Sequence, residues 1–153
     1  MSEKERIRRS MSKFVLLKAW GIVRSTGICI SQALEIAWKL IRSQIHIQAT
    51  KVHGVTFENR QSILKKAAMT NSAYYRVRCI REAHNPHDSN AIAIYIITLN
   101  GQSYKVGYIS KERAVTLAWA MDAGRNLFVL RHEITGTQYE SGHLGMNLEF
   151  IVV

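Results

Sequence analysis

The sequence predicts an α+β protein that is mainly β, in which a helical hairpin precedes a small, partly open barrel of six strands with two further helices. Three observations lead to this fold class. Apolar residues recur at helical spacing up to about residue 44, and beyond residue 45 short runs rich in β-branched residues take over. Asn100-Gly101 between two such runs is a strong hairpin signal. Because six short strands cannot bury a core as a flat sheet, closure around a plugging helix is expected.

The first predicted element is a pair of helices between Lys13 and Gln44. Their apolar positions follow helical spacing, at Phe14, Leu17, Trp20 and Val23 in the first helix and at Leu34, Trp38 and Ile41 in the second. Gly27 supplies a stop for the first helix, and Ser31 is the expected N-cap of the second. We expect Trp20 and Trp38 to pack the two helices together, which gives a helical hairpin over 1–45 and a β domain over 48–153.

Six strands are then expected, at 49–56, 74–82, 91–98, 103–110, 128–135 and 148–153. Asn100-Gly101 should join the third and fourth strands through a type I′ turn, since both residues accept a positive φ. Two helices interrupt the strands. Asn59 can cap one that runs to about Ala68, and Ser110 can cap one over 111–121 that Gly124 ends.

The charge of the chain predicts a polyanionic partner. The formal net charge is +10, and residues 1–52 hold ten Lys or Arg against three acids, while 53–153 hold eleven against eight. The basic side chains of the hairpin could form a phosphate track that leads to the barrel, through Lys13, Lys18, Arg24, Lys39 and Arg42. A solvated helix face is the alternative. The start of the chain carries no apolar signal region, and Lys18 breaks the apolar run at 14–23, so a cytoplasmic protein without membrane attachment is expected.

No group of residues predicts catalysis. The sequence has no glycine-rich phosphate loop, no nucleophile in a recognisable setting and no close carboxylate pair. His84 and His87 lie three apart in a loop rather than on one helix face, and Cys29 and Cys79 have no zinc-ligand spacing. We therefore expect no enzyme activity, no metal, no cofactor and no small-molecule substrate.

The densest polar cluster lies at 82–94 and contains Pro86, the only proline. On its own it is typical of a well-formed turn. Together with two other segments, however, it resembles the HIRAN family over residues 48 to 153. The three matching segments are 52–61, Arg81-Glu82 with Asn85-Pro86-His87-Asp88-Ser89-Asn90-Ala91, and Val106-Gly107-Tyr108-Ile109.

This resemblance implies a six-stranded barrel related to the OB-fold, found alone in bacterial and phage proteins and fused to helicase-like enzymes elsewhere. The best understood members grip the 3′ end of single-stranded DNA. Aromatic rings there stack on terminal bases, and an acid accepts a hydrogen bond from the 3′-hydroxyl. Carried over by position, the nucleic-acid-binding residues would be Thr56, Phe57, Asn85, His87, Asp88, Asn90 and Tyr108.

The residue types suit these roles, with two departures. Phe57 and Tyr108 can serve as stacking platforms, or else as core residues at strand ends. A carboxylate such as Asp88 is repelled by internal phosphates, so it fits a strand end that offers a hydroxyl donor. His87 stands where the family has Tyr, and Thr56 where end-binding members have a basic residue.

The predicted function is therefore binding of single-stranded DNA, and of its 3′ end, as an accessory in DNA processing or repair beside a helicase or nuclease. RNA stays open as a ligand. One alternative is a protein-interaction adaptor, and another is an accessory subunit of a helicase or nuclease without end recognition of its own. The basic helices also resemble short helices in proteins of phages and mobile elements, a resemblance to which no activity is attached.

Overall fold

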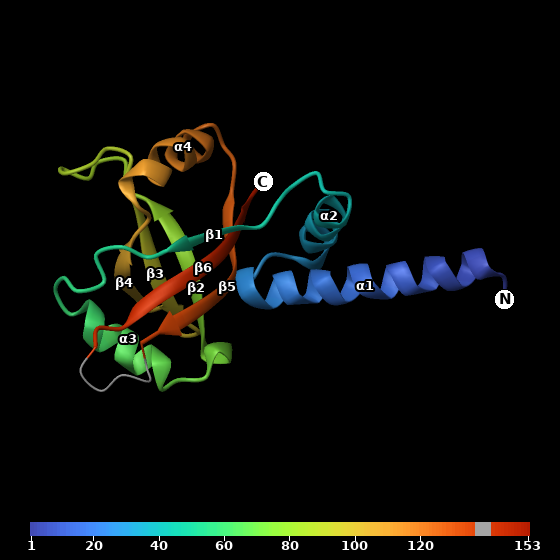
Figure 1. Ribbon diagram of the computed structural model, residues 1–153, viewed down its shortest axis with the longest axis horizontal. Coiled ribbons are helices and arrows are strands. Elements are labelled where there is room, and N and C mark those ends of the chain that lie inside the picture. The colour runs from blue at the N-terminus through green and yellow to red at the C-terminus, as the bar shows by residue number, and fades with distance from the viewer. Residues whose placement is uncertain (137–141) are drawn as a thin grey trace.

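In the computed structural model, which describes residues 1–136 and 142–153, four α-helices accompany two three-stranded antiparallel sheets (Figure 1). The helices are α1 (Glu3–Thr26), α2 (Ile30–Ile41), α3 (Arg60–Ala68) and α4 (Lys111–Asp122), with a short 3-10 turn at Ser72–Tyr74. The strands are β1 (Gln48–Lys51), β2 (Tyr75–Arg81), β3 (Ile92–Thr98), β4 (Ser103–Tyr108), β5 (Leu127–Thr135) and β6 (Gly145–Val152). The mainly β, α+β class is confirmed.

The six strands are not closed into one barrel, and this part of the prediction is wrong. One sheet has the order β1-β6-β5 and the other β2-β3-β4. Among the described residues a single bridge joins them, in which His53 and Tyr108 exchange backbone hydrogen bonds of 2.8 Å. Gly107 permits this approach, since a Cβ there would lie 2.4 Å from the His53 carbonyl oxygen. At the other seam the end of α1 packs against both β2 and β5, and no pairing of described residues joins these strands.

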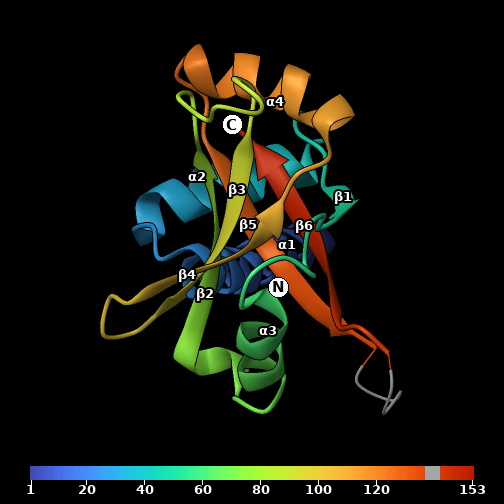
Figure 2. The same ribbon diagram turned by 90° about the vertical axis from the view of Figure 1, so that its left-hand side faces the viewer.

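One core fills the space between the sheets. Its central side chains are completely or almost completely buried and come from both sheets: Ile92, Ile94, Val106, Leu148 and Phe150. Leu64 of α3 and Ala118 of α4 complete it. These two helices lie at opposite ends of the strands (Figure 1; Figure 2). The helix predicted over 111–121 is confirmed.

The helical hairpin exists, but its buried face differs from the prediction. The hairpin core uses Val15, Ala19 and Ile22 of α1 with Ala33 and Ala37 of α2, because small alanines let the helices approach closely. Trp20 is 48% exposed, so it does not pack the helices together; Trp38 is half-buried in the hairpin core. Phe14 and Leu17 are also exposed.

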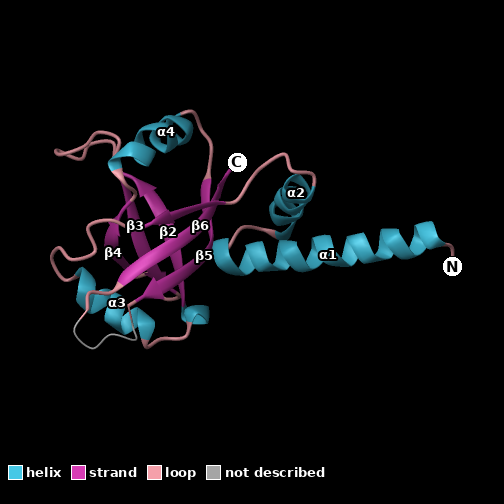
Figure 3. Cartoon of the chain, in the orientation of Figure 1, coloured by secondary structure: helices cyan, strands magenta, loops and turns pink. Residues whose placement is uncertain are grey.

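The ends of the hairpin helices also differ from the prediction. A capping box between Ser2 and Glu5 starts α1 ten residues before Lys13, so the helix extends well beyond the rest of the protein (Figure 3). Cys29, not Ser31, is the N-cap of α2. No single described helix is long and apolar enough to cross a bilayer, although α1 and α2 pass that test as a pair bent by 120°.

The turn between β3 and β4 is not of type I′. The strands pair as predicted, but Asn100 keeps a negative φ and only Gly101 is left-handed, at φ 87°. Gly101 N donates to Thr98 O, and Thr98 N donates to Gln102 O. This pattern is a three-residue loop that ends in a left-handed glycine, and it places Ile97 opposite Ser103, one residue away from the register that a two-residue turn at Asn100-Gly101 would give.

Candidate nucleic-acid interface

A pocket of about 680 Å³ opens where three segments meet: the turn after β1, the loop between β2 and β3, and the junction of β4 with α4. Five of the seven nominated side chains line it, namely Phe57, Asn85, His87, Asp88 and Tyr108. Thr56 and Asn90 lie outside the lining. Residues far apart in sequence are thus gathered at one place, as the resemblance implied.

The loop at 82–91 is a well-formed turn as well as part of the pocket. The side-chain oxygen of Asn85 accepts hydrogen bonds from the backbone N–H groups of His87 and Asp88, at 2.9 and 3.2 Å. Oδ1 of Asp88 accepts one from Asn90 N at 2.9 Å, and Ala91 N donates to Asp88 O. Within the described chain, Oδ2 of Asp88 has no hydrogen-bond partner. The loop therefore fixes the carboxylate and leaves one oxygen available to a ligand.

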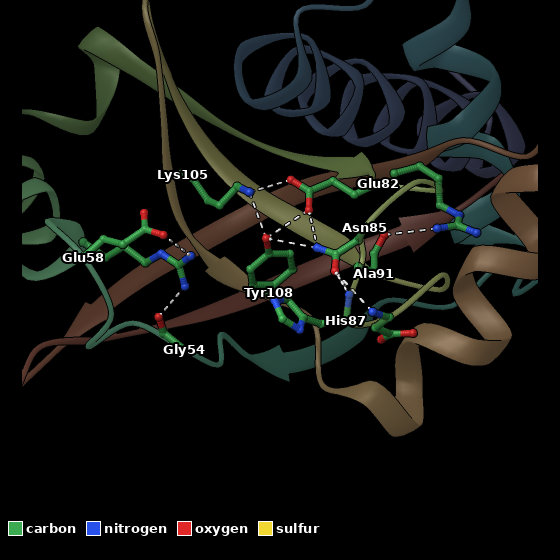
Figure 4. Close-up of polar contacts among 11 residues, drawn as sticks. Gly54, Glu58, Glu82, Asn85, His87, Ala91, Lys105 and Tyr108 are labelled. Carbon is green, nitrogen blue, oxygen red and sulfur yellow. Dashed lines mark hydrogen bonds and ion pairs between the residues drawn. The ribbon is translucent and has the colours of Figure 1, made fainter.

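Beneath this loop, four side chains form a hydrogen-bonded network around Glu82 (Figure 4). Lys105 Nζ lies 2.6 Å from Glu82 Oε1, while Tyr108 OH and Asn85 Nδ2 both donate to Glu82 Oε2 at 2.9 Å. Lys105 also donates to Tyr108 OH at 2.8 Å. The network ties the β2–β3 loop to β4 and so holds two walls of the pocket together.

The network shifts the titration of both of its charged members. Burial would raise the pKa of the Glu82 carboxyl, but hydrogen bonds from Lys105, Asn85 and Tyr108 outweigh this and hold that pKa below its usual value. Burial would likewise lower the pKa of Lys105, but the bonds to Glu82 and Tyr108 raise it well above the normal range for lysine. The ion pair is therefore fully charged at neutral pH.

The two predicted stacking platforms differ in their availability. Phe57 is 65% exposed, so the alternative reading of this residue as core is wrong. The Tyr108 ring is half-buried, with the Arg60 guanidinium 5.3 Å and the Lys105 ammonium 5.0 Å from its centroid. Tyr108 is thus engaged by its neighbours, and Phe57 presents the freer ring.

Arg60 is a pocket residue that the sequence did not nominate. Its side chain is only 7% exposed, yet its charge is incompletely paired: Nη1 donates to Gly54 O at 2.7 Å, and Nη2 lies 3.8 Å from Glu58 Oε1. Nε is buried without a hydrogen-bond partner. A basic residue at the start of a helix is expected at the protein surface. Only the position of Arg60 within the matching segment 52–61 indicated that it could belong to the site. Lys111 adds a second, exposed cation to the pocket.

A model of the HIRAN domain family matches residues 50–152. The chain belongs to the HIRAN family. The resemblance of the three sequence segments is thereby confirmed. Family membership suggests nucleic-acid binding, since HIRAN is a binding domain rather than a catalytic one.

Two solved structures are similar at low identity. A crystal structure of a protein from Lactobacillus plantarum is 23% identical, with 70% of this chain and 98% of that chain covered and a TM-score of 0.45. The HIRAN domain of human HLTF is 22% identical, with 69% of this chain and 74% of that chain covered and a TM-score of 0.41. Among curated proteins, none matches this HIRAN chain.

No metal-binding cluster is present among residues 1–136 and 142–153, where no three His, Cys, Asp or Glu side chains come together to hold an ion. That the protein needs no metal or cofactor stays a prediction, as does the absence of enzyme activity in the whole protein.

Proposed function

We propose that this HIRAN protein binds single-stranded DNA with the 3′ end in the pocket between the β2–β3 loop and α4. The observation that carries the proposal is the convergence of an exposed aromatic ring, Phe57, and a carboxylate with one free oxygen, Asp88, on the same pocket. A ring supplies stacking that tolerates any base. A free carboxylate oxygen selects a hydroxyl donor over a phosphodiester.

The charges of the pocket support the same ligand. A buried cation that is incompletely paired is costly, and Arg60 has only a 3.8 Å contact with Glu58 and an unpartnered Nε. A phosphate beside Arg60 and Lys111 would complete this pairing, while Asp88 would receive the terminal hydroxyl. A DNA end offers both groups within one nucleotide, which an internal segment does not.

Asp88→Asn is the variant that tests end recognition most directly. The Asn side chain keeps an oxygen that can accept from Asn90 N, so the turn is retained, but the free acceptor becomes a donor. Loss of a hydrogen bond to a charged group corresponds to about 1.5–3 kcal/mol, or a tenfold to hundredfold loss of affinity. Glu133→Gln, which removes an exposed carboxylate from β5, is the matched control.

The measurement is fluorescence anisotropy on one labelled strand that carries either a 3′-hydroxyl or a 3′-phosphate. Wild type and Glu133→Gln should prefer the 3′-hydroxyl, and Asp88→Asn should lose that preference. Equal binding of both strands by the wild type would refute end recognition. Comparison with the matching RNA strand decides between the two nucleic acids.

The exposed apolar face of α1 keeps the adaptor alternative open. Phe14, Leu17 and Trp20 are 57%, 59% and 48% exposed on a helix that extends away from the sheets (Figure 1). A folded protein that binds no oligonucleotide would favour the adaptor. An accessory role beside a helicase or nuclease, a cytoplasmic location and a phage or mobile-element origin stay proposals.

A further inference from the structure

A second groove lies at the seam where the end of α1 meets β2 and β5. It is lined by one arginine from each of the three elements: Arg24 of α1, Arg76 of β2 and Arg131 of β5. Arg76 is paired in register with Ile97, near the end of β3, whereas Ala91 of the pocket directly precedes that strand. The length of β3 therefore separates this arginine groove from the pocket.

The arginines of the groove have no ion-pair partner among the described residues, whose four ion pairs all lie elsewhere. No Asp or Glu lines the groove. The nearest carboxylates in the sheet are Glu149, which is opposite Arg131 in the register, and Glu133, two residues along β5. Both line a neighbouring hollow of the β1-β6-β5 sheet, which Arg131 lines as well, but neither lines the groove. The groove thus concentrates positive charge.

Arg76 is held in place by the end of α1. Its Nε donates to the Arg24 carbonyl oxygen at 3.4 Å, and its guanidinium packs over Gly27, where a Cβ would lie 2.6 Å from Nη1. Gly27 has φ 76°, so glycine serves both the helix end and this contact. The fold therefore fixes Arg76, while the side chains of Arg24 and Arg131 are exposed to solvent.

Three arginines brought together from distant parts of the chain repel one another, and an anion relieves that repulsion. The guanidinium group suits phosphate oxygens in particular, because it donates parallel hydrogen bonds to two of them. We propose that the arginine groove is a second nucleic-acid site, which binds the sugar–phosphate backbone without regard to a strand end. This inference does not depend on end recognition in the pocket.

The test uses the double variant Arg24→Gln/Arg131→Gln in the full-length protein. It spares Arg76, which stabilises the contact between hairpin and sheets. Deleting 1–44 is unsuitable, because the hairpin covers Ile151, which is completely buried. The control Lys4→Gln/Arg125→Gln removes the same charge from two exposed side chains, one near the N-terminus and one after α4. Thermal unfolding confirms that both variants are folded.

The readout is the slope of log affinity against log salt concentration, on a strand whose 3′ end is blocked by phosphate. Each phosphate contact on a single strand contributes about 0.7 to this slope, so loss of two contacts should lower it by about 1.4, with much less change in the control. An unchanged slope in the groove variant, or an equal fall of the slope in the control variant, would refute the proposal that the arginine groove binds nucleic acid.

The same measurements separate the two sites. If only the proposal for the pocket is wrong, the wild type shows no preference for a 3′-hydroxyl, yet the salt slope of the groove variant is still lower than that of the wild type. If only the proposal for the groove is wrong, Asp88→Asn still removes the preference for a 3′-hydroxyl, while Arg24→Gln/Arg131→Gln leaves the salt slope unchanged.

Discussion

Glu82→Gln should destabilise the protein because it breaks the network under the pocket. Glu82 accepts from Lys105, Asn85 and Tyr108, and the side chains of Glu82 and Lys105 are 21% and 26% exposed. Gln retains one acceptor oxygen but leaves the Lys105 ammonium without its counter-charge. A fully buried broken pair costs about 3–5 kcal/mol and an exposed one under about 1 kcal/mol, so for this half-buried pair we expect about 2 kcal/mol.

For a chain of 153 residues, this loss corresponds to a fall in Tm of about 4–8 °C. The assay is urea unfolding followed by circular dichroism, for Glu82→Gln, Lys105→Met and the double variant. A coupling energy of about 1 kcal/mol or more between the two positions is expected, since they lie in direct contact. A Glu82→Gln protein as stable as wild type, with no coupling to Lys105, would refute this account of the network.

Phe57→Ala should weaken binding of single-stranded DNA by about 1–3 kcal/mol in an anisotropy titration, while Tm hardly changes because the ring is 65% exposed; unchanged affinity would exclude it as a platform. Gly107→Ala should lower the unfolding free energy by about 2 kcal/mol or more, since a Cβ would meet His53 O at 2.4 Å; a melting curve like that of wild type would contradict this. The lowered pKa of Glu82 stabilises the fold above its unfolded value of 4.5, and this stabilisation is lost as pH falls through the folded pKa. Wild type should thus lose more stability below pH 4.5 than Glu82→Gln does. Parallel profiles of unfolding free energy against pH for the two proteins would count against a lowered pKa of Glu82.

Much of the fold could be predicted from local sequence signals. The period of the apolar residues changes near residue 45, as the elements do, and Gly27 and Gly124 end their helices as left-handed residues. The wrong predictions concern positions whose burial the local sequence pattern does not decide. On α1, the stripe that contains Phe14 and Trp20 is more hydrophobic than the buried one, but helix contact selected the small side chain of Ala19 instead.

The candidate site was predictable only through its motif residues. Asn85 and Asp88 were marked by turn chemistry, and Phe57 by its place in the first segment. Nothing local indicated that Arg60 is buried beside Tyr108, because this depends on α3 packing against β4. The arginine groove was equally hidden, since its members are separated by 52 residues between Arg24 and Arg76.

Periodicity, turn residues and motifs act over a few residues, and they were sufficient to predict the hairpin, the order of the strands along the chain, the family and the loop that carries Asp88. Three features emerged only from the folded structure: the two sheets joined at His53 and Tyr108, the identity of the exposed aromatic ring, and the place where unpaired cations gather. Burial and the pairing of charges depend on contacts between distant segments, and such contacts exist only once the chain has folded.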